Sequence, residues 1–96
     1  MAVRIDPEHN ERAALMLIGT HFDAARVLEV GCGDGRLTRT FAAQARSVVA
    51  IDPDPQAVGD FRAAAWPSDV EALPVGFEAF DPARRRFDVI LFSWSL

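Results

Sequence analysis

The sequence contains very little cysteine and no lysine, and it has no long apolar run. Its single cysteine, Cys32, cannot close an internal disulfide, which is typical of a reducing compartment. No run of about 18 apolar residues is present, so the sequence predicts no membrane-spanning helix. Residues 1–7 also lack the charged-then-apolar layout of a signal peptide. We therefore expect a cytoplasmic location without membrane association.

Basic charge is scarce as well. Ten arginines stand against 14 acidic residues, which gives a formal net charge of −4. Binding to nucleic-acid phosphates needs clustered basic side chains, and we interpret the one basic run, residues 84–86, as a solvated loop. The two histidines, His9 and His21, have no acid or thiol at the spacing of metal ligands. The sequence thus predicts neither a nucleic-acid partner nor a metal site.

Glycines follow an apolar run at the most informative point of the chain. Residues 27–35 read Val-Leu-Glu-Val-Gly-Cys-Gly-Asp-Gly. The apolar start is typical of a strand buried on both faces, and Gly31, Gly33 and Gly35 permit a tight turn whose backbone approaches a ligand closely. A helix beginning at about Gly35 would turn its free N–H groups toward this loop. The pattern predicts a nucleotide-binding loop.

A second apolar run, residues 47–51, ends in Asp52. In a doubly wound sheet the second strand lies beside the first. A carboxylate at its tip, about twenty residues after the first glycine, is placed to accept hydrogen bonds from ribose hydroxyls. The two runs together predict a site for an adenosine-containing cofactor.

The glycine spacing separates two classes of cofactor. A dinucleotide fingerprint would place its third glycine at position 36, where this chain has Arg36. In these features the sequence resembles the class I S-adenosylmethionine-dependent methyltransferases. Residues 27–35 resemble that family's first motif, residues 49–52 its second, and residues 87–93 its fourth-strand motif.

The resemblance implies a fold, a cofactor and an activity. The fold is a three-layer α/β domain over residues 1–96, with a Rossmann-like, doubly wound parallel sheet that is truncated after the fourth strand. The activity is transfer of a methyl group from S-adenosylmethionine to an acceptor that the sequence does not identify. In-line methyl transfer needs mainly positioning, so no catalytic residue is assigned. With no histidine placed near it, Cys32 is not expected to be a catalytic thiol.

The candidate cofactor-binding residues come from the two motifs and from the tips of the later strands. They are Glu29, Gly31, Cys32, Gly33, Gly35, Asp52, Pro53, Glu78 and Ser93. By the resemblance, Glu29 orders the loop and holds the cofactor's amino group through water, and Asp52 takes the ribose hydroxyls. Ser93 and Trp94 would lie near the methionine end.

Hydrophobic periodicity and proline positions predict the other elements. We expect helices from Asp6 or Asn10 to about Thr20, from about Gly35 to Ala45 and from Gln56 to about Ala65, and strands over residues 27–30, 47–51, 73–77 and 87–92.

Either Glu78 or Asp81 would bind the adenine amino group, as the resemblance implies for an acid beyond the third strand. The path to strand four must cross three strand spacings, about 14 Å, and return one strand length, about 17 Å. From Asp81 only five residues precede Phe87, whereas from Glu78 there are eight. At about 3.3 Å per residue the longer path is comfortable, so Glu78 is preferred.

Two other functions remain open. The chain could be a non-catalytic cofactor-binding module that pairs with a partner, or with a second copy of itself, along the exposed edge of strand four. A nicotinamide-dependent oxidoreductase is the third interpretation, disfavoured by Arg36 and by the absence of a substrate domain.

Overall fold

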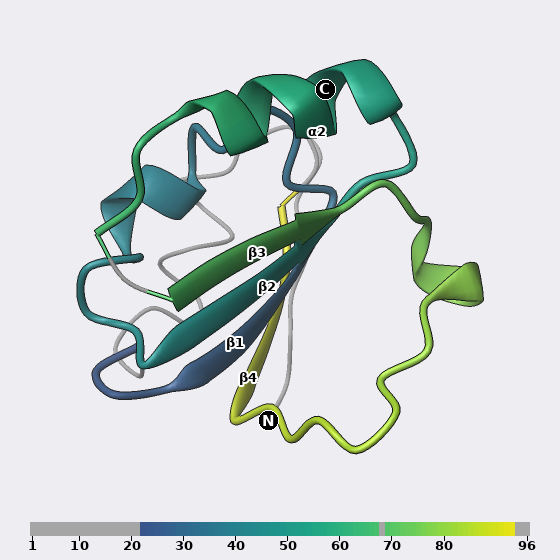
Figure 1. Ribbon diagram of the computed structural model, residues 1–96. Coiled ribbons are helices and arrows are strands. Elements are labelled where there is room, and N and C mark those ends of the chain that lie inside the picture. The colour runs from purple at the N-terminus through teal and green to yellow at the C-terminus, as the bar shows by residue number, and fades with distance from the viewer. Residues whose placement is uncertain (1–21, 68, 94–96) are drawn as a thin grey trace.

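The computed structural model describes residues 22–67 and 69–93, and it shows a four-stranded parallel sheet (Figure 1). The strands are β1 (Arg26–Val30), β2 (Ser47–Ile51), β3 (Asp69–Leu73) and β4 (Val89–Phe92). Their order is β3-β2-β1-β4, so the chain crosses from one edge of the sheet to the other after β3. This confirms the Rossmann-like, doubly wound fold expected from the sequence. The expected first helix, residues 6–20, lies outside the described residues.

The strand register brings the predicted site residues to one edge of the sheet. Val30 at the end of β1 pairs with Ile51 of β2 and with Phe92 of β4. The residues that follow these positions directly are Gly31, Asp52 and Ser93. Parallel strands therefore place the glycine loop, the carboxylate and the serine side by side at their carboxyl ends.

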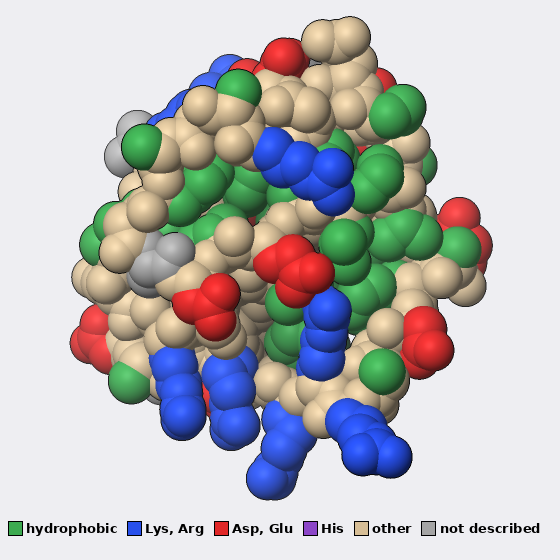
Figure 2. Space-filling model, viewed as in Figure 1, with side chains coloured by type: hydrophobic (Ala, Val, Ile, Leu, Met, Phe, Trp, Pro, Cys, Tyr) green, Lys and Arg blue, Asp and Glu red, His purple; other side chains and the backbone are tan. Residues whose placement is uncertain are grey.

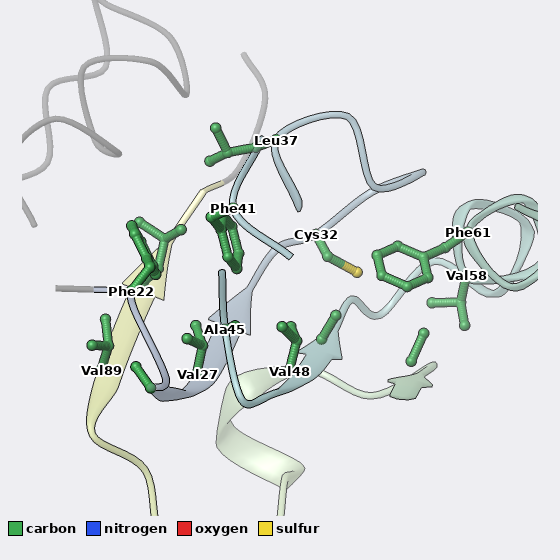
Figure 3. Close-up of a cluster of buried hydrophobic side chains, with 14 residues drawn as sticks. Phe22, Val27, Cys32, Leu37, Phe41, Ala45, Val48, Val58, Phe61 and Val89 are labelled. Carbon is green, nitrogen blue, oxygen red and sulfur yellow. The ribbon is translucent and has the colours of Figure 1, made fainter. Parts of the chain in front are cut away.

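One face of the sheet is covered by the two crossover segments (Figure 3). The helix α2 spans Pro55–Ala63, and Asp54 is its N-cap: the Asp54 side chain accepts a hydrogen bond from the Gln56 N–H. Pro55 suits the first turn. Val58 and Phe61 lie three residues apart on the buried side of α2. The prediction of this helix is confirmed, although it ends at Ala63 and not near Ala65.

The segment after the glycine loop differs from the expected helix. It contains only a short 3-10 helix, η2 (Thr38–Thr40), followed by turns. Its apolar residues still enter the core, as their spacing predicted: Leu37, Phe41 and Ala45 are all buried. Single helical turns persist in it, since the Ala42 N–H donates to the Thr38 carbonyl at 2.9 Å, and the two threonines lower its helix propensity slightly. The Thr40 hydroxyl donates to the Leu37 carbonyl at 2.7 Å.

The third strand was predicted four residues too late. It spans Asp69–Leu73 and not residues 73–77. β3 is an edge strand, so Asp69 and Glu71 can stand in it with their side chains in water, whereas Pro74 cannot donate a ladder hydrogen bond. The error at β4 has the opposite sign, since this strand begins at Val89, two residues later than expected.

Two arginines join neighbouring segments to β3: Arg62 lies in α2, and Arg85 lies in the connection from β3 to β4. The Arg62 guanidinium donates two hydrogen bonds to the Ala72 carbonyl, at 3.0 and 2.7 Å. Arg85 forms an ion pair with Glu71 at 3.3 Å. Charged side chains of this kind protect an edge strand from further pairing. β4 is the other edge among the described residues, and pairing of a further strand along it stays a prediction.

The second face of the sheet carries apolar residues under an irregular cover. Leu28, Val49 and Ile51 form its centre, and Phe80 and Phe87 pack against them. The cover is the connection from β3 to β4, which holds a short 3-10 helix, η3 (Phe77–Ala79). Figure 2 shows apolar side chains at the surface between β3 and this connection. None of the helices in the described part of the chain has the length and apolarity that crossing a membrane would require.

An ion pair joins β1 to β4 at the amino ends of the two strands. Arg26 contacts both carboxylate oxygens of Asp88 at 3.1 Å, and its backbone N–H donates to Asp88 at 2.8 Å. In return, the Asp88 N–H donates to the Arg26 carbonyl at 2.8 Å. These side-chain and backbone hydrogen bonds from Arg26 lower the pKa of the Asp88 carboxyl to about 2.

Asp88→Asn should therefore destabilise the fold at neutral pH. The pKa of Asp88 is lower in the folded chain than the value of about 3.9 expected when the chain is unfolded. The ionised carboxylate therefore adds to the free energy of unfolding above about pH 4, and this contribution disappears as the pH falls toward 2. Urea unfolding followed by circular dichroism at pH 7 and at pH 2.5 should show a difference from wild type that shrinks at the lower pH. Asp69→Asn, on the exposed end of β3, is the control. If Asp88→Asn lowered the free energy of unfolding equally at both pH values, the carboxylate form of Asp88 would not be what stabilises the fold.

Candidate functional site

A pocket of about 400 Å³ lies at the carboxyl ends of β1 and β2, between the glycine loop and the first turns of α2. Its lining comes from the loop, from the tip of β2 and from one side of α2. The lining residues are Gly31, Cys32, Gly33, Asp34, Arg36, Asp52, Asp54, Gln56, Ala57 and Asp60. This is the ligand crevice expected at the switch point of a doubly wound sheet.

Hydrogen bonds tie the glycine loop to the tip of β2. The N–H groups of Gly31 and Cys32 both donate to the Ile51 carbonyl, at 2.8 and 3.1 Å. The Gly33 N–H donates to the Asp52 carboxylate at 2.9 Å. The loop is thus held over the end of the neighbouring strand before any ligand binds.

Two glycines of the loop are required for different reasons. Gly33 has φ +57°, and a β-carbon built there would meet nothing within 4 Å, so its absence keeps the pocket side of the loop open. Gly35 has φ +92°, and a β-carbon there would lie 2.6 Å from the ring of Trp66 and 2.9 Å from the ring of Phe61. Only glycine fits at position 35, because the backbone conformation and the close contact both exclude a side chain.

Asp52 is held in a fixed orientation at the pocket wall. One carboxylate oxygen accepts from Gly33, and the other accepts from the Asp54 N–H at 2.9 Å. Each oxygen can accept more than one hydrogen bond, so both retain capacity toward the pocket. A carboxylate oriented in this way is suited to binding a pair of adjacent hydroxyl groups.

The pocket is acidic. Four of its ten lining residues are aspartates and one, Arg36, is basic. Such a lining favours ligands that carry positive charge or hydroxyl donors, and it opposes a pyrophosphate. Among the described residues, no group of histidine, cysteine and acidic side chains could hold a metal ion.

A buried carboxylate lies directly behind the loop. Glu29, on the central strand β1, has an exposed fraction of 0%. It accepts hydrogen bonds from the hydroxyls of Thr38 and Ser93. Ser93 is 4% exposed, and its N–H donates to the Val30 carbonyl at 2.9 Å. Glu29 therefore joins the segment after the glycine loop to the tip of β4.

The side chain of Cys32, one of the residues that line the pocket, is buried and belongs to the hydrophobic core. Figure 3 shows it pointing toward the ring of Phe61 on α2. Burial raises the pKa of the Cys32 thiol, and the carboxylates of Glu29 and Asp52 raise it further. A raised pKa disfavours the thiolate, which is the nucleophilic form of cysteine.

Comparisons with known proteins match this architecture. A family model described as a methyltransferase domain matches residues 27–96. The chain belongs to this methyltransferase family. No curated protein gives a significant match.

Solved structures of methyltransferases share the fold. An S-adenosylmethionine-dependent methyltransferase from Mesorhizobium loti is 21% identical with a TM-score of 0.71, over 83% of this chain and 37% of that one. The N-methyltransferase NodS from Bradyrhizobium japonicum WM9 is 26% identical with a TM-score of 0.70, over 83% and 45%. The plantazolicin methyltransferase BpumL, in complex with SAH, is 20% identical with a TM-score of 0.63, over 70% and 26%. The chain spans less than half the length of each.

The structure brings together some of the residues predicted from the methyltransferase motifs. Gly31, Cys32, Gly33 and Asp52 line the pocket. The other candidates are not among its lining residues: Glu29 and Ser93 are buried behind the loop, Gly35 packs against Trp66, and Pro53 and Glu78 are exposed. Trp94 lies outside the described residues. The role of Glu78 at the adenine stays a prediction.

Sequence reasoning did not assign six of the pocket residues: Asp34, Arg36, Asp54, Gln56, Ala57 and Asp60. Two signals could have indicated part of this wall. Asp54 followed by proline is typical of a helix start, and Gln56 and Asp60 share one side of that helix because they are four residues apart.

Gly35→Ala should destabilise the methyltransferase fold far more than Gly33→Ala. The left-handed backbone alone costs roughly 1 kcal/mol at either position. At Gly35 the overlap with Trp66 and Phe61 adds about 2 kcal/mol, because well-packed rings must move. Urea unfolding monitored by circular dichroism measures both. Equal losses would show that the contact with Trp66 is not tight.

Thr38→Val should cost about 2 kcal/mol of unfolding free energy, because it removes a hydroxyl bonded to the buried Glu29 carboxylate. Thr40→Val is the matched control, since it removes only the local hydrogen bond to Leu37. It should cost less than about 1 kcal/mol. The same unfolding assay compares the two variants, and a Thr40 effect as large as that at Thr38 would argue against a special role for Glu29.

Proposed function

We propose that this chain binds S-adenosylmethionine in the pocket between the glycine loop and α2, and serves methyl transfer to an acceptor. The observation that carries the proposal is the arrangement of Asp52. Its carboxylate stands at the carboxyl end of β2, bonded to the Gly33 N–H, with both oxygens at the wall of an acidic pocket.

The residues present fit this cofactor. Asp52 would accept hydrogen bonds from the two ribose hydroxyls, while Gly31 and Gly33 allow the loop backbone to approach the ligand. The aspartates around them favour a ligand with a positively charged sulfonium and ammonium group. The open space beside Gly33 leaves room for the ligand at the loop.

The same lining counts against a nicotinamide cofactor. A pyrophosphate is bound by the N–H groups of a helix that begins at the loop. Here the loop leads into a three-residue 3-10 helix, and four aspartates line the pocket. Both features remove the favourable field that a dinucleotide needs, so the oxidoreductase interpretation loses further support.

The chain's own contribution to the reaction would be binding and orientation. When bound, S-adenosylmethionine supplies an activated methyl group for in-line displacement. Asp52 and the glycine loop would fix the adenosyl part, so that the methyl group takes a defined place at the sheet edge. The solved relative BpumL, which was crystallised with SAH, shares this fold. The methyl acceptor is left open.

Calorimetric titration with S-adenosylhomocysteine tests the proposal. Wild type should bind with saturation, and Asp52→Ala should bind at least about tenfold more weakly, because it loses hydrogen bonds to a charged group. Asp69→Ala, at the far end of β3, is the matched control and should bind as wild type does. Circular dichroism confirms that each variant is folded.

The outcome that would contradict the proposal is equally defined. A folded wild-type chain that binds NADH with saturation and does not bind S-adenosylhomocysteine would support an oxidoreductase. Equal affinity of Asp52→Ala and wild type would mean that the cofactor lies elsewhere on the chain.

A further inference from the structure

Trp66 packs between α2 and the glycine loop. Its ring stacks on Phe61 of α2, with ring centroids 4.3 Å apart and an interplanar angle of 22°. Its indole N–H donates to the Phe61 carbonyl at 2.9 Å. The ring is therefore fixed to the last turns of α2 by packing and by a hydrogen bond.

The other side of the same ring touches the glycine loop. A β-carbon at Gly35 would lie 2.6 Å from the ring, so the backbone of the loop rests directly on it. The Arg39 guanidinium stands 5.7 Å from the ring centroid, and the Arg39 N–H donates to the Gly35 carbonyl at 3.1 Å. Trp66 thus contacts both the last glycine of the loop and the segment that follows it.

Phe61 completes the connection between the walls. Its ring is 1% exposed, and the Cys32 thiol at the start of the loop points toward it. The rings of Phe61 and Trp66 therefore support both ends of the glycine loop from the side of α2. The pocket lies between these two elements, and neither ring is among its lining residues, so the rings act on it through the loop and α2.

We propose that Trp66 is a positioning residue that sets the separation between the glycine loop and α2, and through it the affinity for the cofactor. The proposal rests on the function proposed above. Well-packed interiors do not close freely around a lost ring, so a smaller residue at position 66 leaves the loop backbone without its support. The loop N–H groups and Asp52, which is bonded to Gly33, then lose their fixed relation to α2.

Two variants at position 66 test the affinity. Trp66→Leu removes the stacking and the indole hydrogen bond, and Trp66→Phe keeps an aromatic ring that is too small to reach the same contacts. S-adenosylhomocysteine should bind about tenfold more weakly to Trp66→Leu, with Trp66→Phe between it and wild type. Phe77→Leu is the matched control, because Phe77 is 48% exposed and packs on Phe92 outside the pocket. Affinity of a folded Trp66→Leu within twofold of wild type would overturn the proposal.

Hydrogen exchange of the loop amides gives a readout that needs no cofactor. In Trp66→Leu the amides of residues 33–39 should exchange faster, while those of β1 and β2 should keep their wild-type rates. Unchanged loop exchange would overturn the positioning role. A uniform acceleration over the sheet would also overturn it, because Trp66 would then only stabilise the fold.

Fluorescence separates this proposal from the function on which it rests. Because the chain has a second tryptophan, Trp94, the titration uses Trp94→Phe, in which Trp66 is the remaining tryptophan. Addition of S-adenosylhomocysteine to this variant should change the emission of Trp66, and an unchanged emission on saturable binding would count against its role. Failure of wild type to bind in calorimetry would overturn the proposed function, whereas binding with equal affinity in all variants would overturn only the role of Trp66.

Discussion

The buried carboxylate of Glu29 is the constraint on which the other parts of the site depend. It stands on the central strand, with no exposed surface, and its oxygens accept from Thr38 and Ser93. A carboxylate without such partners would make the interior unstable, because burial of an unpaired charge costs several kcal/mol. The hydrogen bonds of Glu29 therefore couple the segment after the glycine loop to the tip of β4. The backbone that lines the pocket is thus tied to a buried group of the core.

The parts of the fold that depend on local patterns could be predicted from the sequence. β1 and β2 are mostly apolar and lie between clear turn signals. Their bounds could therefore be predicted to within one residue, together with the position of Asp52 at the end of β2. β3 could not be located in the same way. As an edge strand it exposes Asp69 and Glu71, and a period-based prediction instead chose the more apolar residues after it. The neighbours of a strand decide which residues it tolerates.

The second wall of the pocket depends on contacts between residues far apart in the chain. Gly35 and Trp66 meet because Trp66, just after α2, stacks on Phe61 beside the loop, and no local pattern connects the two positions. The motifs identified the three glycines and assigned them to a ligand-binding loop, but they did not indicate that Gly35 packs against the ring of Trp66. Ser93 likewise donates its hydroxyl to Glu29, a contact that the motif did not indicate, and its place near the cofactor stays a prediction. Sequence motifs indicate which residues matter more reliably than they indicate what those residues contact.

The glycine loop is held from three directions, and each support acts on a different part of it. Asp52 and Ile51 hold its first residues from β2, and Glu29 holds the segment after it through Thr38. The rings of Phe61 and Trp66 pack against Gly35. A loop held at one end could adjust to many ligands, whereas three supports leave the backbone little freedom. The entropic cost of ordering is then met during folding and not during binding. In the methyl transfer proposed above, an in-line displacement depends on placement more than on acid or base groups, so a preorganised loop is the contribution that this part of the chain would make.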